Sequence, residues 1–228
     1  MVIPFQEEGL ELFLLDRCAG EAQIRGMQRL VIYGAGGFGR EIWGMEQAKR
    51  EVVFCDDAQT GMLLGAPIIS SSQIGDDDEL FLALADPIAR RRVAERFTGA
   101  RFASIHAPTA IIAPTVEIGE GSFFCHYTHA SVSAQIGRQL LCHVYAYIGH
   151  ENVIGDFVTV GPRASLNGNV TVRDGAYIGA GAIVRQGITI GAGATVGMGA
   201  VVTKDVAPAS TVVGNPARAL ARAVRRAA

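Results

Sequence analysis

The chain has 228 residues, 28 of them glycine, with a formal net charge of −2 and a pI near 6.2. This length can bury two hydrophobic cores, and many glycines with only 7% aromatic residues suit a tightly coiled β-structure better than a helical bundle. The slightly acidic balance argues against a nucleic-acid or anionic-membrane partner. No apolar run reaches the roughly 18 residues of a membrane helix.

The first 27 residues carry several acidic side chains around the short apolar run Leu10–Leu15. A secretory signal would need a basic start and a longer apolar core. We therefore expect residues 1–27 to form a poorly ordered leader and the protein to be cytoplasmic. The cysteines show neither a CxxC pair nor metal-ligand spacing, which fits reduced thiols and no bound metal: Cys18, Cys55, Cys125 and Cys142.

Residues 28–104 alternate between strand and helix patterns, which predicts a small Rossmann-like domain with a parallel sheet. The expected elements are strands at 29–33, 51–55 and 79–85, a helix from Arg40 to about Lys49, and a helix from Pro87 to about Phe97. Proline is favoured in the first turn of a helix, which supports the last of these boundaries.

A glycine-rich turn joins the first strand to the first helix, at Gly34, Gly36, Gly37 and Gly39. Such a turn before a helix can hold a phosphate, and it fits equally well a purely structural role in close strand–helix packing. Asp56 and Asp57 follow the second strand, at the distance from the turn where an acidic residue grips a ribose. Fewer than eighty residues are too few for two mononucleotide halves. The pattern therefore favours a mononucleotide or nucleotide sugar over NAD.

Every sixth residue from Ile112 to Val202 is apolar, at sixteen positions without a break. Neither a helix nor a flat strand has a period of six, whereas each side of a parallel β-helix does. Three sides make an 18-residue coil, so we expect a β-helix over residues 105–218 and a tail at 219–228. Glycine often follows the inward residue, which suits a corner where a side chain or a positive φ would clash.

The two halves together resemble the sugar O- and N-acyltransferases typified by the sialic acid and bacillosamine acetyltransferases. The resemblance rests on the turn Ile32–Gly39, the Asp56–Asp57 pair, the hexapeptide repeat and the closing segment Val212–Arg218. It implies a left-handed coil, acetyl-CoA as co-substrate and a nucleotide-linked amino sugar held by the N-terminal domain. It also implies a homotrimer with each active site between two subunits.

Transfer of an acetyl group to an amine needs a base near neutral pH, which histidine provides. His150 lies two residues after an inward position and faces outward, and Glu151 can orient its ring and stabilise its charged form. One coil later, Gly168 leaves space for the ring, and a backbone N–H there can hold an oxyanion. The family places its catalytic histidine, followed by Glu or Asp, in the same motif.

By resemblance, the pantetheine arm of the donor lies along coil edges near Gly179, Ala180, Gly197 and Met198. The chain departs from the family at two positions. Thr159 stands where a second histidine contacts the acetyl donor, and we expect its backbone N–H to reach the thioester oxygen. His143 stands where the family has an asparagine, and it either contacts the acceptor sugar or packs.

These features predict an acetyltransferase that moves acetyl from acetyl-CoA to the amino group of a nucleotide-linked amino sugar, with direct attack on the thioester. Two alternatives are O-acetylation of sialic acid or another sugar hydroxyl, and a non-catalytic nucleotide-sugar-binding scaffold. A metal-dependent hydratase using His126, His143 and His150 is disfavoured, because the N-terminal domain would have no purpose in it.

Overall fold

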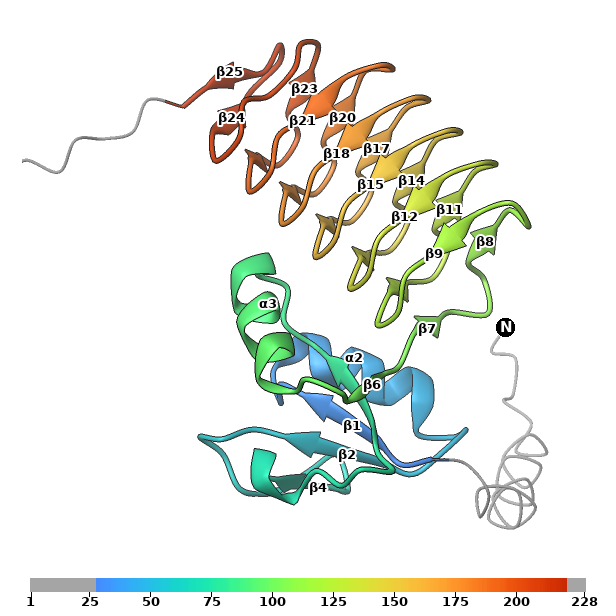
Figure 1. Cartoon of the computed structure of the whole chain (residues 1–228), viewed down its shortest axis with the longest axis vertical. Coiled ribbons are helices and arrows are strands. Elements are labelled where there is room, and N and C mark those ends of the chain that lie inside the picture. The colour runs from blue at the N-terminus through green and yellow to red at the C-terminus, as the bar shows by residue number, and fades with distance from the viewer. Residues whose placement is uncertain (1–27, 221–228) are drawn as a thin grey trace, which may run out of the picture. The chain divides into compact units, whose positions relative to one another are not determined.

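The computed structural model describes residues 28–220, which divide into two compact units between Ala83 and Leu84. The predicted leader, residues 1–27, lies outside the described residues, as do residues 221–228 of the predicted tail. The first unit is an α/β domain, and the second is built mainly from short stacked strands (Figure 1).

A mixed sheet forms the centre of the first unit with the strand order β3-β4-β2-β1-β5, in which β3 pairs antiparallel with β4 and the other pairs are parallel. Its strands are β1 (Leu30–Tyr33), β2 (Val52–Cys55), β3 (Gly61–Leu63), β4 (Ala66–Ile69) and β5 (Glu79–Leu82), and a short 3-10 helix spans Ser71–Gln73. β1 pairs in parallel with β2 and β5, as the alternating pattern predicts. The β3–β4 hairpin has no counterpart in the sequence prediction.

Helix α2 (Gly37–Glu46) follows β1 and begins three residues earlier than predicted. The difference arises because the last glycines of the turn already belong to the helix. Gly36 is the N-cap residue, and its carbonyl accepts a hydrogen bond from the Arg40 N–H at 3.1 Å. Among residues 28–220, Gly36 makes no side-chain capping hydrogen bond at this N-terminus.

The second unit contains a parallel β-helix with three faces, preceded by α3 (Pro87–Arg96) and β6 (Arg101–Phe102). The first face has eight strands: β7 (Ile105–His106), β10 (Phe123–Phe124), β13 (Leu141–Cys142), β16 (Thr159–Val160), β19 (Tyr177–Ile178), β22 (Thr195–Val196), β24 (Thr211–Val213) and the antiparallel β25 (Arg218–Ala219). The second face has β8 (Ile111–Ile112), β11 (His129–Ala130), β14 (Tyr147–Ile148), β17 (Ser165–Leu166), β20 (Ile183–Val184) and β23 (Val201–Val202). The third has β9 (Glu117–Ile118), β12 (Gln135–Ile136), β15 (Val153–Ile154), β18 (Thr171–Val172) and β21 (Thr189–Ile190).

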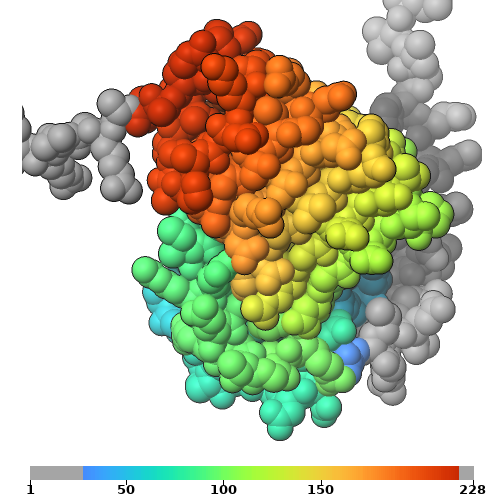
Figure 2. Space-filling view, turned by 45° about the horizontal axis from the view of Figure 1, so that its top comes forward, coloured from blue at the N-terminus to red at the C-terminus, as the bar shows by residue number. Residues whose placement is uncertain are grey.

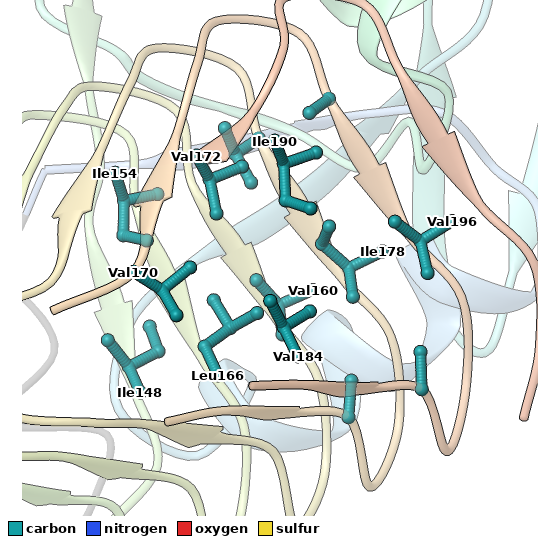
Figure 3. Packing of buried hydrophobic residues seen from close by; sticks show 14 of the residues in the cluster. Ile148, Ile154, Val160, Leu166, Val170, Val172, Ile178, Val184, Ile190 and Val196 are labelled. Atoms are coloured by element: carbon teal, nitrogen blue, oxygen red, sulfur yellow. The ribbon is translucent and has the colours of Figure 1, made fainter. Parts of the chain in front are cut away.

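The six-residue period marks the core of this β-helix, as predicted. Fourteen of the sixteen positions are buried, while Ile112 and Ile118 in the first coil are partly buried against the same core. Figure 3 shows the later positions pointing into one interior column, and Figure 2 shows the coils stacked as parallel bands. Each fully buried aliphatic side chain contributes about 1.5–3 kcal/mol, so burial of these side chains stabilises the β-helix.

The corners of the coil follow a fixed conformational rule. From Ile118 to Val196, a left-handed φ falls three residues after each inward position, for example +58° at Glu151, rather than directly after it. The glycines directly after the inward positions are explained by close packing between coils and not by their φ. A Cβ on Gly149 would collide with the backbone of Asn167 and Gly168 in the next coil. We call the corners between faces one and two, two and three, and three and one corner 1, corner 2 and corner 3.

Helix α3 belongs by its contacts to the β-helix unit, although the sequence prediction groups it with residues 28–104. The buried Arg90 guanidinium donates to carbonyl oxygens of the residues just before the helix and of two successive coils. Its acceptors are the carbonyls of Leu84, Ala85, Gln139, Phe157 and Val158 and the hydroxyl of Thr159, at 2.6–3.3 Å. Burial lowers the pKa of Arg90 to about 9, which leaves it charged at neutral pH.

We predict that Arg90→Met destabilises the protein by about 2–4 kcal/mol, because several buried carbonyls lose their donor. The matched control is Arg92→Met on the exposed side of the same helix. Urea unfolding of the two variants is the measurement, and equal stability losses would contradict the role assigned to Arg90.

Candidate functional site

His150 and Glu151 form a paired acid–base unit at corner 2. His150 Nδ1 lies 3.1 Å from Glu151 Oε2, and both side chains are about half exposed. An Nδ1–H that donates to this carboxylate leaves Nε2 as the proton acceptor. The arrangement can take up a proton at Nε2 while the carboxylate stabilises the charged ring. The structure thus brings the two predicted residues together.

Gly168 lies one coil further on, beside the His150 ring. A Cβ on Gly168 would collide with Nε2 and Cε1 of that ring, so glycine leaves the space that the imidazole occupies. The Gly168 carbonyl accepts from the Gly187 N–H at 3.1 Å, and Asn169 N–H donates to the His150 carbonyl at 2.9 Å. Within residues 28–220, the Gly168 N–H has no acceptor. It can therefore donate to an oxyanion near Nε2.

The residues predicted to line the donor arm lie along corner 1. They occupy equivalent positions in successive coils, since Gly179 and Ala180 are followed 18 residues later by Gly197 and Met198. A Cβ on Gly179 would collide with the backbone of the next coil, and Met198 is 80% exposed. In these last two coils, corner 1 is therefore an edge with small residues and one long, exposed apolar side chain, whereas its earlier coils carry the exposed Tyr127 and Tyr145.

The two sets of residues lie on different edges of the same chain. His150 and Gly168 are at corner 2, whereas Gly179 and Met198 are at corner 1, one whole face of the coil away. His143 also begins corner 1, in the same column as Gly179. A single chain does not bring all the predicted site residues into one place.

The expectation for Thr159 is wrong. Its backbone N–H donates to the Ala176 carbonyl at 3.1 Å within the strand ladder, so it is not available to a thioester oxygen. Its side chain is 1% exposed, donates to the Ala85 carbonyl at 2.9 Å and accepts from Arg90 at 3.1 Å. Thr159 therefore holds helix α3 to the coil. The sequence carried no signal for this role, because Arg90 lies 69 residues away.

His143 is a second, electrostatically different histidine. Burial and then the positive charge of Arg90 lower its pKa to about 4, so the ring is neutral at neutral pH. The ring makes an edge contact with Phe123, with the ring centres 6.0 Å apart. A neutral imidazole can exchange hydrogen bonds with a ligand. The chain neighbours of His143 are Cys142 and Val144, whereas the residue after His150 is a glutamate.

The glycines of the first unit divide into two kinds. Gly34 has φ of +113°, and a Cβ on Gly39 would collide with the Gly34 carbonyl, so these two serve the backbone and close packing. Gly36 and Gly37 have open space around them at the uncapped start of α2. Backbone N–H groups at such a helix start suit a phosphate.

The acidic pair after β2 is partly used by the fold. Asp57 accepts from the Tyr33 hydroxyl and from the Ser71 N–H, both at 3.0 Å. Asp56 accepts from the Ala58 N–H at 2.9 Å and from the Gln59 side-chain amide at 3.0 Å. Both carboxylates shape the loop after β2, and any bond to a ligand must use their remaining lone pairs.

Other features of the described residues lie apart from these positions. A hollow of about 700 Å³ at corner 3, bordered by Arg173, Asp174 and Asp205, contains none of the predicted site residues. No cluster of three metal-ligating side chains occurs among residues 28–220, and none of the helices described there is long and apolar enough to cross a membrane. Cys142 is fully buried, and burial raises the pKa of its thiol.

We predict that Gly168→Ala lowers kcat for the expected acetyl transfer by about 10- to 100-fold, because the new methyl group displaces the imidazole. Gly168 does not have a left-handed φ, so the backbone tolerates alanine. Gly44→Ala, at an open position of α2, is the control. Steady-state kinetics and melting temperatures are the measurements. A Gly168→Ala protein with unchanged kcat would show that the ring position does not matter.

Two family models match the chain. The PglD N-terminal domain matches residues 29–97, and the bacterial transferase hexapeptide model of six repeats matches residues 153–186 and 169–204. The first match runs through helix α3, which the contacts group with the β-helix.

Relatives of known type agree with these matches. GDP-perosamine N-acetyltransferase of Escherichia coli O157:H7 is 37% identical over 143 residues, which are 56% of this chain and 65% of that protein. The structure of WeeI from Acinetobacter baumannii AYE is 37% identical with a TM-score of 0.81, covering 85% of this chain and 100% of that one. The acetyltransferase domain of PglB from Neisseria gonorrhoeae FA1090, in complex with acetyl coenzyme A, is 29% identical with a TM-score of 0.79, covering 86% and 100%.

These likenesses confirm the predicted fold class, a Rossmann-like domain followed by a left-handed β-helix. The chain belongs to the sugar O- and N-acyltransferase family of hexapeptide-repeat proteins, the family that its sequence resembles.

Proposed function

We propose that the protein transfers an acetyl group from acetyl-CoA to the amino group of a nucleotide-linked amino sugar. The observation that carries this proposal is the His150–Glu151 pair, held over Gly168 with Nε2 free to accept a proton. The relatives support the donor and the acceptor class, since one is named a GDP-perosamine N-acetyltransferase and another was solved with acetyl coenzyme A.

The proton path follows from the hydrogen bonds of His150. The sugar ammonium first loses a proton to solvent, and the neutral amine attacks the thioester carbonyl carbon. His150 Nε2 accepts the second amine proton, and Glu151 stabilises the resulting imidazolium through Nδ1. When the C–S bond breaks, the imidazolium returns that proton to the leaving thiolate of coenzyme A.

The unpaired Gly168 N–H supplies the oxyanion contact in this proposal. The carbonyl oxygen gains negative charge as the amine attacks, and a fixed N–H beside it stabilises the transition state by about 3 kcal/mol. A backbone donor held at both ends by neighbouring coils needs little reorganisation during the reaction. The sequence suggested an N–H contact to this oxygen from both Gly168 and Thr159, and because the Thr159 N–H is bonded within the strand ladder, the proposal uses the Gly168 N–H.

Direct transfer is favoured over an acetyl-enzyme intermediate. Cys142 faces the core of the coil, and burial raises the pKa of its thiol, so it forms no thiolate near neutral pH. Cys125 is also buried and does not adjoin the His150–Glu151 pair in the coil.

The N-terminal unit is proposed to hold the nucleotide of the acceptor. The uncapped start of α2 offers N–H groups to a diphosphate, with open space at Gly36 and Gly37. The exposed loop of Asp56 and Asp57 adjoins the end of β2, where a base or ribose can accept or donate further hydrogen bonds.

We also propose a homotrimer in which corner 2 of one copy faces corner 1 of the next. The support is that a single chain carries the base at corner 2 and the expected donor edge at corner 1, with one whole face between them. A threefold arrangement repeats one interface and joins the two edges three times.

The first test is coenzyme A release from acetyl-CoA with a panel of nucleotide-linked amino sugars that includes GDP-perosamine. We expect one acceptor to be used, His150→Ala to lower kcat by 10²- to 10⁴-fold, and Glu151→Gln to lower it by about tenfold. His129→Ala, an exposed histidine on the second face, is the control.

Each outcome of this assay separates two interpretations. Full activity of His150→Ala would remove His150 as the base. Transfer to sialic acid with none to amino sugars would favour the O-acetyltransferase, and a lack of acetyl-CoA binding would favour a non-catalytic scaffold.

Complementation tests the shared site. Met198→Glu is expected to block the donor edge, and His150→Ala removes the base, so neither variant is active alone. Co-expression of the two should restore about a quarter of wild-type activity if each site joins two copies at random. A monomer by light scattering, or no recovery in mixed trimers of two inactive variants, would contradict the shared site.

A further inference from the structure

A buried asparagine stands in an otherwise apolar column at corner 2. Asn152 is 0% exposed, and the equivalent positions in the other coils are Val116, Ala134, Val170 and Ile188. Burying an amide in such a column is costly unless the amide is hydrogen-bonded. The partners of Asn152 therefore indicate what this residue contributes.

The Asn152 side chain bridges the corner of the following coil. Its Nδ2 donates to the Leu166 carbonyl at 3.3 Å, and its Oδ1 accepts from the Val170 N–H at 2.7 Å. Leu166 and Val170 stand on either side of residues 167–169, and both point into the core in Figure 3. One amide thus connects the two ends of this corner from inside.

Corner 1 closes in a different way. At corner 1, the backbone N–H at the position equivalent to Val170 donates to a carbonyl of the same turn. An example is the Ala164 N–H, which donates to the Gly161 carbonyl at 3.1 Å. At the corner of residues 167–169, the Asn152 side chain supplies the acceptor instead. The conformation of this corner therefore depends on a residue of the preceding coil.

This corner carries Gly168. We infer that Asn152 is a positioning residue that fixes the direction of the Gly168 N–H relative to the His150 ring. The inference rests on the proposed function, in which that N–H stabilises the oxyanion. Asn169 N–H to the His150 carbonyl and Gly187 N–H to the Gly168 carbonyl hold the corner from the neighbouring coils. Asn152 adds the constraint from the interior.

A donor that acts mainly in the transition state affects kcat more than substrate binding. Loosening of residues 167–169 should therefore lower kcat and leave both KM values nearly unchanged. The Asn152 side chain bonds to Leu166 and Val170 and not to the His150–Glu151 pair. The pH dependence of kcat/KM should therefore keep its midpoint.

The test uses Asn152→Ala and Asn152→Val, which place at this position the residues found at 134 and 170. Both are residues that the column already accommodates, so the coil is expected to form. The control is Thr128→Val, which removes the hydroxyl bond to the Cys125 carbonyl at 2.9 Å in a buried corner of an earlier coil. We expect kcat to fall by about 10- to 100-fold in the Asn152 variants, with KM changed less than about threefold.

Hydrogen–deuterium exchange provides a readout that does not need activity. Amides of residues 166–171 should exchange faster in both Asn152 variants and at the wild-type rate in Thr128→Val. Unchanged exchange there would overturn the inference, even if the wild-type protein proved to be inactive. A kcat loss that Thr128→Val shares would also overturn it, since the effect would then come from general stability. A shifted pH midpoint would overturn it as well, since the effect would then come from the His150 imidazole.

Failure of the proposed function looks different. In that case, wild-type protein shows no acetyl transfer, or His150→Ala retains it. Faster exchange in the Asn152 variants without a change in a measurable kcat would show that Asn152 stabilises the corner but does not position the Gly168 N–H for catalysis.

Discussion

Everything in the β-helix depends on stacking of the coils in register, because each residue lies next to the residue 18 positions away. The narrow interior accepts one large aliphatic side chain per side, so the outward positions and corners are the places left for chemistry. Because of this register, His150 lies beside Gly168, and the Asn152 side chain accepts a hydrogen bond from the Val170 N–H. A shift of one residue in the repeat would separate all of these pairs.

Electrostatic surroundings distinguish the two histidines near the predicted site. His150 is half exposed and has a carboxylate at 3.1 Å from its Nδ1, which can orient the ring. His143 is held neutral by burial and by the charge of Arg90. The two rings have the same chemistry in isolation, but of the two, His150 has the surroundings that suit the proposed general base.

Arg90 links helix α3 to the coils and also gives Thr159 a structural role. A buried guanidinium needs several acceptors, and carbonyls of two coils and the Thr159 hydroxyl provide them. Thr159 is thereby committed to the fold. The family model of the N-terminal domain extends through this helix, whereas its contacts are with the β-helix. The helix is thus a part of the domain by sequence likeness and a part of the coil by packing.

The sequence alone determined the architecture, because the period of six at sixteen positions admits one geometry. It also predicted His150, Glu151 and Gly168 as site residues, from their positions in the repeat and from the family resemblance. It also predicted β1, β2, β5 and α3 closely. Only the tertiary structure decided that the Thr159 hydroxyl accepts a hydrogen bond from Arg90 and that Asp57 accepts one from Tyr33. The same holds for the Asn152 side chain, which bridges a corner of the next coil. The physical reason is that local spacing fixes which residues stack within a repeat. Hydrogen bonds between segments far apart in the sequence have no such period and appear only when the chain is folded.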